Sequence, residues 1–138
     1  MTNGVYVLAI WIKEDVGINV GALGHIDFVK GLYAYVGSAQ GSLEKRVERH
    51  FGKSKRKFWH IDYLLDNEIV EILKVFHKEA RRTEECKIAQ KISQTSLPVD
   101  GFGSSDCKCA SHLFKLKSYQ ILEKLMRETH MQSGSLVQ

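Results

Sequence analysis

Three segments in the first third of the chain carry the hydrophobic patterning of strands. Residues 4–12 are an unbroken run of apolar, β-branched and aromatic side chains, which predicts a central strand. Residues 18–23 are predicted as a second strand that pairs back on the first, with residues 24–30 as a connector. Residues 32–38 are rich in aromatic side chains and bounded by glycines, so they predict a third strand. Three neighbouring strands with short connections favour an antiparallel meander.

Capping residues and helical spacing predict the remaining elements. Ser42 is typical of a helix N-cap, and the helix is expected to run to Phe51 and stop at Gly52. The later predicted elements are a helical turn over 58–65, a strand over 69–77, a helix over 84–93 capped by Thr83, a glycine-rich loop over 98–105, a short strand over 113–117 and a helix over 119–129. We therefore predict one α/β (α+β) domain over residues 1–130, with a small, mostly antiparallel sheet flanked by helices. Residues 131–138 are expected to form a flexible C-terminal tail.

Composition limits the class of protein. The chain has 138 residues, of which 43% are hydrophobic and 26% charged, as expected of one soluble domain. No apolar run approaches the roughly 20 residues of a membrane span, and no secretory signal is visible. Three cysteines, an odd number, argue for reduced thiols. These features predict a cytoplasmic protein without a membrane partner.

The net charge of +4 is concentrated in one segment. Residues 42–60 contain seven basic and two acidic residues, whereas the rest of the chain has thirteen basic and fourteen acidic ones. On the helix predicted over 43–51, the apolar positions form one stripe, and a neighbouring face carries Arg46, Arg49, His50 and Lys53. A one-sided cationic face suits phosphate recognition because the guanidinium fork matches phosphate oxygens. A merely solvated helix surface is the alternative.

Two short motifs lead into this helix and resemble the GIY-YIG endonuclease superfamily. Gly4-Val5-Tyr6 stands for the first motif and Tyr35-Val36-Gly37 for the second. The stretch YVGSAQGSLEKRVERHF also matches the superfamily's strand–turn–helix pattern, in which an arginine is followed four residues later by a histidine. The motifs are 28 residues apart, more than is usual in the superfamily, and an extra strand or loop over residues 17–30 would absorb the difference.

Three features together resemble one branch of the superfamily in particular. They are the longer spacing between the two motifs and the stretches FWHIDYLL and GFGSSDCKCASHLF. This branch is the archaeal family of uncharacterised proteins known as domain of unknown function 123. Its members occur alone or joined to an endonuclease III-type DNA glycosylase. The resemblance runs from about residue 4 to residue 114 and implies a GIY-YIG-like fold.

The resemblance to the superfamily implies roles for four side chains. Tyr6 would act as general base or order the attacking water, and Tyr35 would contact the phosphate or the water. Arg46 would neutralise charge on the phosphate in the transition state, and His50 would hydrogen-bond within the site. The superfamily also holds a divalent metal ion through one glutamate on a later helix.

Glu85 is the candidate for that glutamate, and helical spacing gives an independent reason. It shares a stripe with Ile88, Ala89 and Ile92, so its carboxylate should point toward the protein, where it needs a partner or a cation. Glu84 points elsewhere and is the weaker candidate. The alternative for Glu85 is a salt bridge to a structural arginine. A single carboxylate with waters and a phosphate suits Mg²⁺ or another divalent cation.

These inferences predict a metal-dependent endonuclease that hydrolyses DNA phosphodiester bonds. A role in DNA repair would follow, with an endonuclease III-type glycosylase as a functional neighbour. The residues expected to contact nucleic acid are Arg49, Lys53, Lys55, Arg56, Lys57 and His60. For His60 the alternative is aromatic packing with a hydrogen-bonded ring. Two other functions stay open: a catalytically inactive nucleic-acid-binding module of the same fold, and a thiol- or zinc-stabilised interaction protein.

A cluster of potential zinc ligands lies outside this set. Cys107, Cys109 and His112, with Asp106 beside them, offer thiolate and imidazole groups. The fourth ligand would come from Cys86, His60 or His77. Structural zinc sites usually use two ligand pairs separated by a loop, so the crowding of these residues argues against zinc and for thiols packed in the loop. A second functional interpretation is that the loop borders the cleft, where Ser104 and Ser105 would offer hydroxyls to the substrate.

Overall fold

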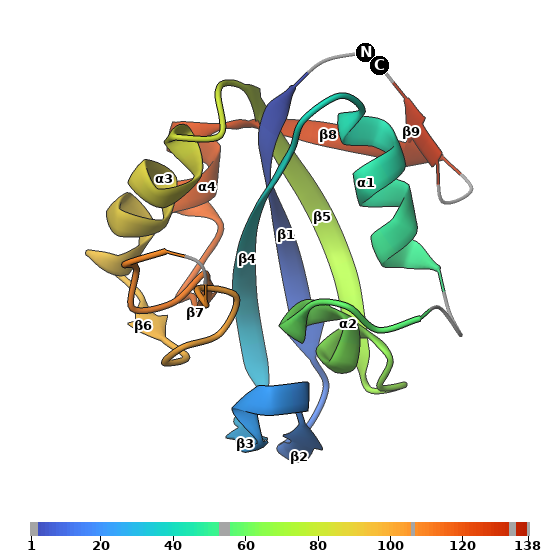
Figure 1. Cartoon of the computed structure of the whole chain (residues 1–138), viewed down its shortest axis with the longest axis vertical. Coiled ribbons are helices and arrows are strands. Elements are labelled where there is room, and N and C mark those ends of the chain that lie inside the picture. The colour runs from blue at the N-terminus through green and yellow to red at the C-terminus, as the bar shows by residue number, and fades with distance from the viewer. Residues whose placement is uncertain (1–2, 53–55, 106, 133–134, 138) are drawn as a thin grey trace.

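The strand β1 (Gly4–Ile12) organises the fold in the computed structural model, which describes residues 3–52, 56–105, 107–132 and 135–137. It lies between β4 (Gly31–Ala39) and β5 (Val70–Glu79) and pairs antiparallel with both (Figure 1). Eight of its nine residues are buried, because helices pack on both faces of the sheet. The predicted α+β domain with a mostly antiparallel sheet is confirmed.

Within the described residues the sheet has seven strands, in the order β6-β7-β4-β1-β5-β8-β9. The outer strands are β6 (Leu97–Pro98), β7 (Leu113–Lys115), β8 (Arg127–Gln132) and β9 (Ser135–Val137). The part of the chain that the structure describes contains no helix long and apolar enough to span a membrane.

The segment between β1 and β4 folds on itself. β2 (Val16–Asn19) and β3 (His25–Phe28) form a separate two-stranded antiparallel sheet, joined through a 3₁₀ turn over Gly21–Leu23. The predicted pairing of residues 18–23 with the first strand is therefore wrong, because β1 has both neighbours supplied by β4 and β5. The expectation that an extra element absorbs the long spacing between Tyr6 and Tyr35 is confirmed.

Alternate side chains along β1 pack into two hydrophobic cores, one on each face of the sheet. Tyr6, Leu8 and Ile10 pack toward α1 (Leu43–Phe51) and α2 (His60–Leu65). Val5, Val7 and Ala9 pack toward α3 (Glu84–Ser93) and α4 (Gln120–Leu125). This alternation follows from the two-residue period of a strand, and it places one helix pair on each face of the sheet (Figure 1).

The observed ends and caps of the helices match the predicted ones to different degrees. Ser42 caps α1, accepting a hydrogen bond from the Lys45 backbone N–H at 3.3 Å, and α1 ends before Gly52 as predicted. The range of α3 is the predicted one, but the Thr83 side chain makes no capping hydrogen bond in the described part of the chain.

The C-terminal region departs most from prediction. The helix expected over 119–129 ends at Leu125, and β8 follows and pairs with β5. β8 and β9 include residues 131–132 and 135–137, for which the sequence predicts no regular structure. Pairing with β5 satisfies backbone groups along an otherwise exposed strand edge, a gain that local helical spacing cannot reveal.

The second half of β4 forms an open edge of the sheet. β7 pairs with β4 only over Tyr33–Tyr35. Beyond that point the described strands leave this side of β4 unpaired, although the Val36 N–H donates to the His112 carbonyl at 2.9 Å. Side chains from the two helical layers can therefore meet at this edge, which is where the candidate site lies.

Candidate functional site

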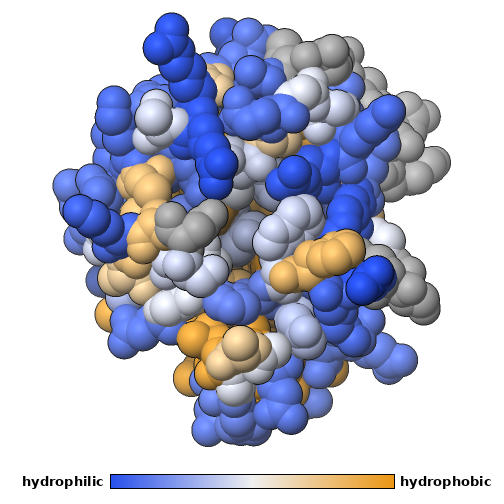
Figure 2. All heavy atoms as spheres, viewed as in Figure 1, coloured by the Kyte–Doolittle hydropathy of each residue, from blue (hydrophilic) through white to orange (hydrophobic). Residues whose placement is uncertain are grey.

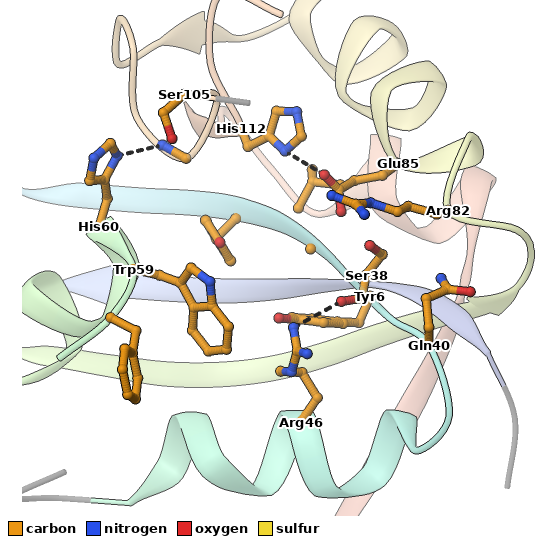
Figure 3. A pocket seen from close by; sticks show the side chains of 15 residues that line it. Tyr6, Ser38, Gln40, Arg46, Trp59, His60, Arg82, Glu85, Ser105 and His112 are labelled. Carbon is orange, nitrogen blue, oxygen red and sulfur yellow. Dashed lines mark hydrogen bonds and ion pairs between the residues drawn. The ribbon is translucent and has the colours of Figure 1, made fainter. Parts of the chain in front are cut away.

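A pocket of about 420 Å³ opens beside the second half of β4. Figure 2 shows this face hollowed near its centre, with hydrophilic residues over much of the rim. Figure 3 shows that Tyr6, Arg46 and Trp59 approach from one side of β4 and Arg82, Glu85 and His112 from the other. The polar and aromatic residues of the lining include Tyr6, Tyr35, Ser38, Gln40, Arg46, Phe58, Trp59, His60, Arg82, Glu85, Ser105 and His112.

Tyr6 and Gly37 depend on each other sterically. They face each other in the β1–β4 register, and a Cβ on residue 37 would lie 2.5 Å from the Tyr6 Cζ and Oη atoms. Glycine at position 37 therefore makes room for the Tyr6 ring. The Tyr6 hydroxyl lies 2.6 Å from the His50 Nε2 atom, and both side chains are buried. Burial raises the pKa of Tyr6 well above its ordinary value, against the lowering effect of the nearby Arg46 guanidinium.

Tyr35 is held by the glycine-rich loop. Its ring contacts Phe102 edge-on at a centroid distance of 6.3 Å. Gly103 adopts a φ of +70°, and a Cβ there would lie 3.1 Å from the Tyr35 ring. The left-handed backbone and the close approach both require glycine. Burial raises the pKa of Tyr35 well above its ordinary value, so both tyrosines are neutral phenols near pH 7.

Arg46 reaches the pocket from the first turns of α1. One of its guanidinium nitrogens donates to the Ser38 carbonyl at 3.2 Å. The guanidinium also lies 4.6 Å from the centroid of the Trp59 ring, while that of Arg49 lies 4.5 Å from the same ring. Trp59 is thus in cation–π contact with two arginines, and it is a pocket residue whose role the sequence does not indicate.

The Arg49 side chain is engaged by Asp62, and the nucleic-acid contact predicted for it stays a prediction. Its guanidinium donates to both oxygens of Asp62, at 2.8 and 3.0 Å, and it does not line the pocket. The fully buried Asp62 carboxylate also accepts from the backbone N–H groups of Phe58 and Trp59, at 2.8 and 3.0 Å. Burial favours a higher pKa for Asp62, but these hydrogen bonds and the Arg49 charge hold it below the ordinary value. The pair therefore fixes the start of α2, and Trp59 with it.

The other predicted nucleic-acid contacts divide into three groups. His60 lines the pocket, and its Nδ1 atom accepts from the Gly103 N–H at 2.9 Å. Burial lowers the pKa of His60. Arg56 lies beside the exposed Phe58 ring, whereas Lys57 pairs with Asp66 at 3.3 Å, away from the pocket. Lys53 and Lys55 lie outside the described residues.

Glu85 lines the pocket from the first turn of α3. Its Oε2 atom lies 3.1 Å from the His112 Nδ1 atom, and its side chain is 20% exposed. Burial favours a higher pKa for Glu85, but hydrogen bonds from His112 and Ser38 hold it below the ordinary value. The partner is thus a histidine where the sequence alternative was an arginine. Glu84 pairs with Lys78 and Lys87 on the surface and does not line the pocket.

The cysteine loop brings four potential metal ligands together. The sulfur atoms of Cys86, Cys107 and Cys109 and a ring nitrogen of His112 lie within 4.8 Å of one another. Of the three alternatives for the fourth ligand, the structure joins Cys86 to the group. Ser105 lines the pocket, whereas Ser104 is buried and does not. Asp106 lies outside the described residues.

The chain was also compared with known proteins. No curated protein and no solved structure matches this chain. The model of a family described as "Domain of unknown function DUF123" matches residues 5–135. That range contains every residue described above as lining the pocket. The chain therefore belongs to the DUF123 family, whose function is unknown.

Proposed function

We propose that the pocket binds a DNA phosphodiester and hydrolyses it with the help of a divalent cation at Glu85. The observation that carries the proposal is the meeting of Tyr6, Tyr35, Arg46 and Glu85 in one pocket, although β1, β4, α1 and α3 each supply one of them. Phosphodiester hydrolysis requires positive charge at the phosphate oxygens and an oriented water. The pocket offers side chains suited to both.

Arg46 is suited to hold the phosphate. The Ser38 carbonyl and the Trp59 ring fix the direction of its guanidinium. A guanidinium has five N–H donors, so donors beyond the one that Ser38 accepts can point at phosphate oxygens. Because the pocket is partly enclosed by protein, this charge is less screened than it would be on an open surface.

Tyr6 and His50 are suited to move the proton of the attacking water. Burial raises the pKa of Tyr6, so we assign its neutral hydroxyl the part of a proton relay. Its hydroxyl can donate to the His50 Nε2 atom, 2.6 Å away. As the water oxygen bonds to phosphorus and one ester P–O bond breaks, the water proton passes to the Tyr6 oxygen and the Tyr6 proton passes to His50. The leaving oxygen takes a proton from solvent.

The Glu85 carboxylate fits a divalent cation of the Mg²⁺ type. It lines the pocket and its lowered pKa keeps it ionised near pH 7. One carboxylate is enough because Mg²⁺ keeps several waters and takes further oxygens from a phosphate. When bound, such a cation would stabilise the negative charge that develops on the phosphate.

The mouth of the pocket is suited to an unpaired base. Phe58 is 65% exposed and Trp59 is 38% exposed. Arg56 lies 5.4 Å from the Phe58 ring centroid. Exposed aromatic rings beside cations are the usual means of binding bases without reading their sequence. We therefore expect single-stranded or branched DNA to bind better than a continuous duplex.

The test is cleavage of end-labelled single-stranded, branched and duplex DNA, and single-stranded RNA, by tag-free protein with Mg²⁺ or Mn²⁺. Chelator should stop the reaction, and Arg46→Ala should lower the rate about 100- to 1000-fold, as for loss of one group that stabilises transition-state charge. Arg127→Ala is the matched control, because Arg127 is an exposed arginine away from this pocket.

Two outcomes would count against hydrolysis. If the protein binds DNA tightly but neither metal produces cleavage, the inactive binding module is the better description. If Arg46→Ala and Glu85→Gln cleave as fast as the wild type, the pocket is not the site of the activity.

A further inference from the structure

The ligand cluster beside the pocket brings four donor atoms close enough together to share one metal ion. Cys86 comes from the first turn of α3, whereas Cys107, Cys109 and His112 come from the loop before β7. The His112 Nε2 atom lies 3.4 Å from the Cys107 sulfur and 3.8 Å from the Cys86 sulfur. With Zn–S bonds of about 2.3 Å and Zn–N bonds of about 2.0 Å, tetrahedral ligand atoms lie roughly 3.5–3.8 Å apart. The two nitrogen-to-sulfur separations are within about 0.1 to 0.3 Å of the roughly 3.5 Å expected for an N–S pair, and all four ligand atoms lie within 4.8 Å of one another.

The backbone around the cluster holds its ligands in place. The His112 N–H donates to the Phe102 carbonyl at 2.7 Å, and the His112 carbonyl accepts from Val36 of β4. The Phe102 side chain is fully buried in the core, and His112 is 1% exposed. The three thiols are free cysteines. A fold that brings three thiols and an imidazole to one point on an anchored loop favours a soft, tetrahedrally coordinated ion.

The second nitrogen of His112 supplies an independent observation. While Nε2 faces the sulfur atoms, Nδ1 lies 3.1 Å from the Glu85 carboxylate. Histidines that bind zinc almost always donate their other ring N–H to a carboxylate, a backbone carbonyl or a water, which fixes the tautomer and the ring orientation. The Glu85 contact supplies the partner that a zinc-bound His112 needs, and it was found without reference to the positions of the cysteines.

We propose that Cys86, Cys107, Cys109 and His112 bind one Zn²⁺ ion and that Glu85 orients His112 as a ligand. The crowding of the three loop residues, which argued against zinc in the sequence, is offset by a ligand from a separate element. The site also ties α3 to the loop, and it places a fixed histidine against the carboxylate that lines the pocket. The zinc site does not depend on the proposed hydrolysis.

The first test is the metal content of tag-free protein, measured by plasma mass spectrometry, with cobalt as a spectroscopic probe. One zinc per chain is expected. Replacement by Co²⁺ should give thiolate-to-cobalt charge-transfer bands and the intense visible bands of tetrahedral cobalt. Cys107→Ser should lower metal content, His112→Cys should keep it through a fourth thiolate, and His25→Asn is the control for loss of an exposed histidine.

If Cys107→Ser does not fold, the wild-type protein still decides the question. Its thiols should react slowly with a disulfide reagent and become reactive when a strong chelator is added. Zinc far below one per chain together with no uptake of Co²⁺ would overturn the proposal. So would a cobalt spectrum without charge-transfer bands, or a disulfide among these cysteines.

The second test concerns Glu85. Glu85→Ala should weaken zinc binding about 10- to 100-fold, as loss of a carboxylate partner does at other zinc sites, measured by competition with a chromophoric chelator. Glu84→Ala is the matched control, because Glu84 is the neighbouring carboxylate and contacts none of the ligands in the described structure. Equal zinc affinity in the two variants would refute the role of Glu85. Failure to cleave DNA would leave both measurements unaffected.

Discussion

Asp62 provides the most direct test of how the pocket is held together. Among the described residues, its buried carboxylate accepts four hydrogen bonds, two from Arg49 and one each from the backbone of Phe58 and Trp59. In Asp62→Asn the charge is lost and an NH₂ group replaces one of the accepting oxygens. Breaking a buried ion pair by changing one partner costs roughly 3–5 kcal/mol. We expect Asp62→Asn to lower the free energy of unfolding by about that amount.

The pH dependence of this loss has a definite sign. The pKa of Asp62 in the folded protein lies below its ordinary value of 3.8. The ionised carboxylate therefore stabilises the fold above that value, and the stabilisation is lost as pH falls through the folded pKa. The difference between wild type and Asp62→Asn should be constant from pH 7 to near the ordinary pKa and should shrink below it.

Urea unfolding followed by tryptophan fluorescence measures both effects. Asp66→Asn is the matched control, because Asp66 is partly exposed and pairs with Lys57 at 3.3 Å on the surface. Its cost should stay below about 1 kcal/mol. The reasoning fails if Asp62→Asn costs no more than Asp66→Asn, or if its cost at pH 3 equals its cost at pH 7.

Three further predictions concern the pocket. Gly37→Ala should cost about 1–3 kcal/mol in urea unfolding, because its Cβ would displace the Tyr6 ring; an effect no larger than that of Gly52→Ala would contradict this. Trp59→Ala should weaken single-stranded DNA binding by about 1–3 kcal/mol in fluorescence anisotropy, and unchanged affinity would remove the proposed stacking role. The logarithm of DNA affinity should fall linearly with the logarithm of salt concentration, and Arg46→Ala should reduce that slope by about one; equal slopes would show that Arg46 does not contact phosphate.

Local pattern predicts the elements whose signals lie within a few residues. The continuous apolar run of β1 and the Ser42 cap of α1 are of this kind. β8 is not, because its strand conformation depends on the free edge of β5 rather than on its own spacing. The β2–β3 hairpin could not be predicted either, because the pairing of its strands depends on which strands lie beside β1 in the folded chain.

The candidate site divides in a similar way. Tyr6, Tyr35, Arg46 and Glu85 were identified from motif resemblance and helical spacing, and the fold brings them to one pocket. The position of Trp59 in the pocket and the pairing of Arg49 with Asp62 could not be predicted. Both depend on hydrogen bonds to Asp62 that form only in the folded chain. Cys86 could not be chosen over His60 or His77, because the choice depends on where α3 places its first turn.

The central position of β1 also affects the order of folding. Its second neighbour, β5, is far along the chain, with Gly4 paired to Glu79 and Ile12 to Val70. Pairings between such distant residues require large loops to close before contacts form, and they slow folding. During synthesis β1 and β4 can pair early, but one edge of β1 stays open until β5 has emerged. β1 is therefore completed only after β5 has been made, and until then its unpaired apolar edge is open to misassembly.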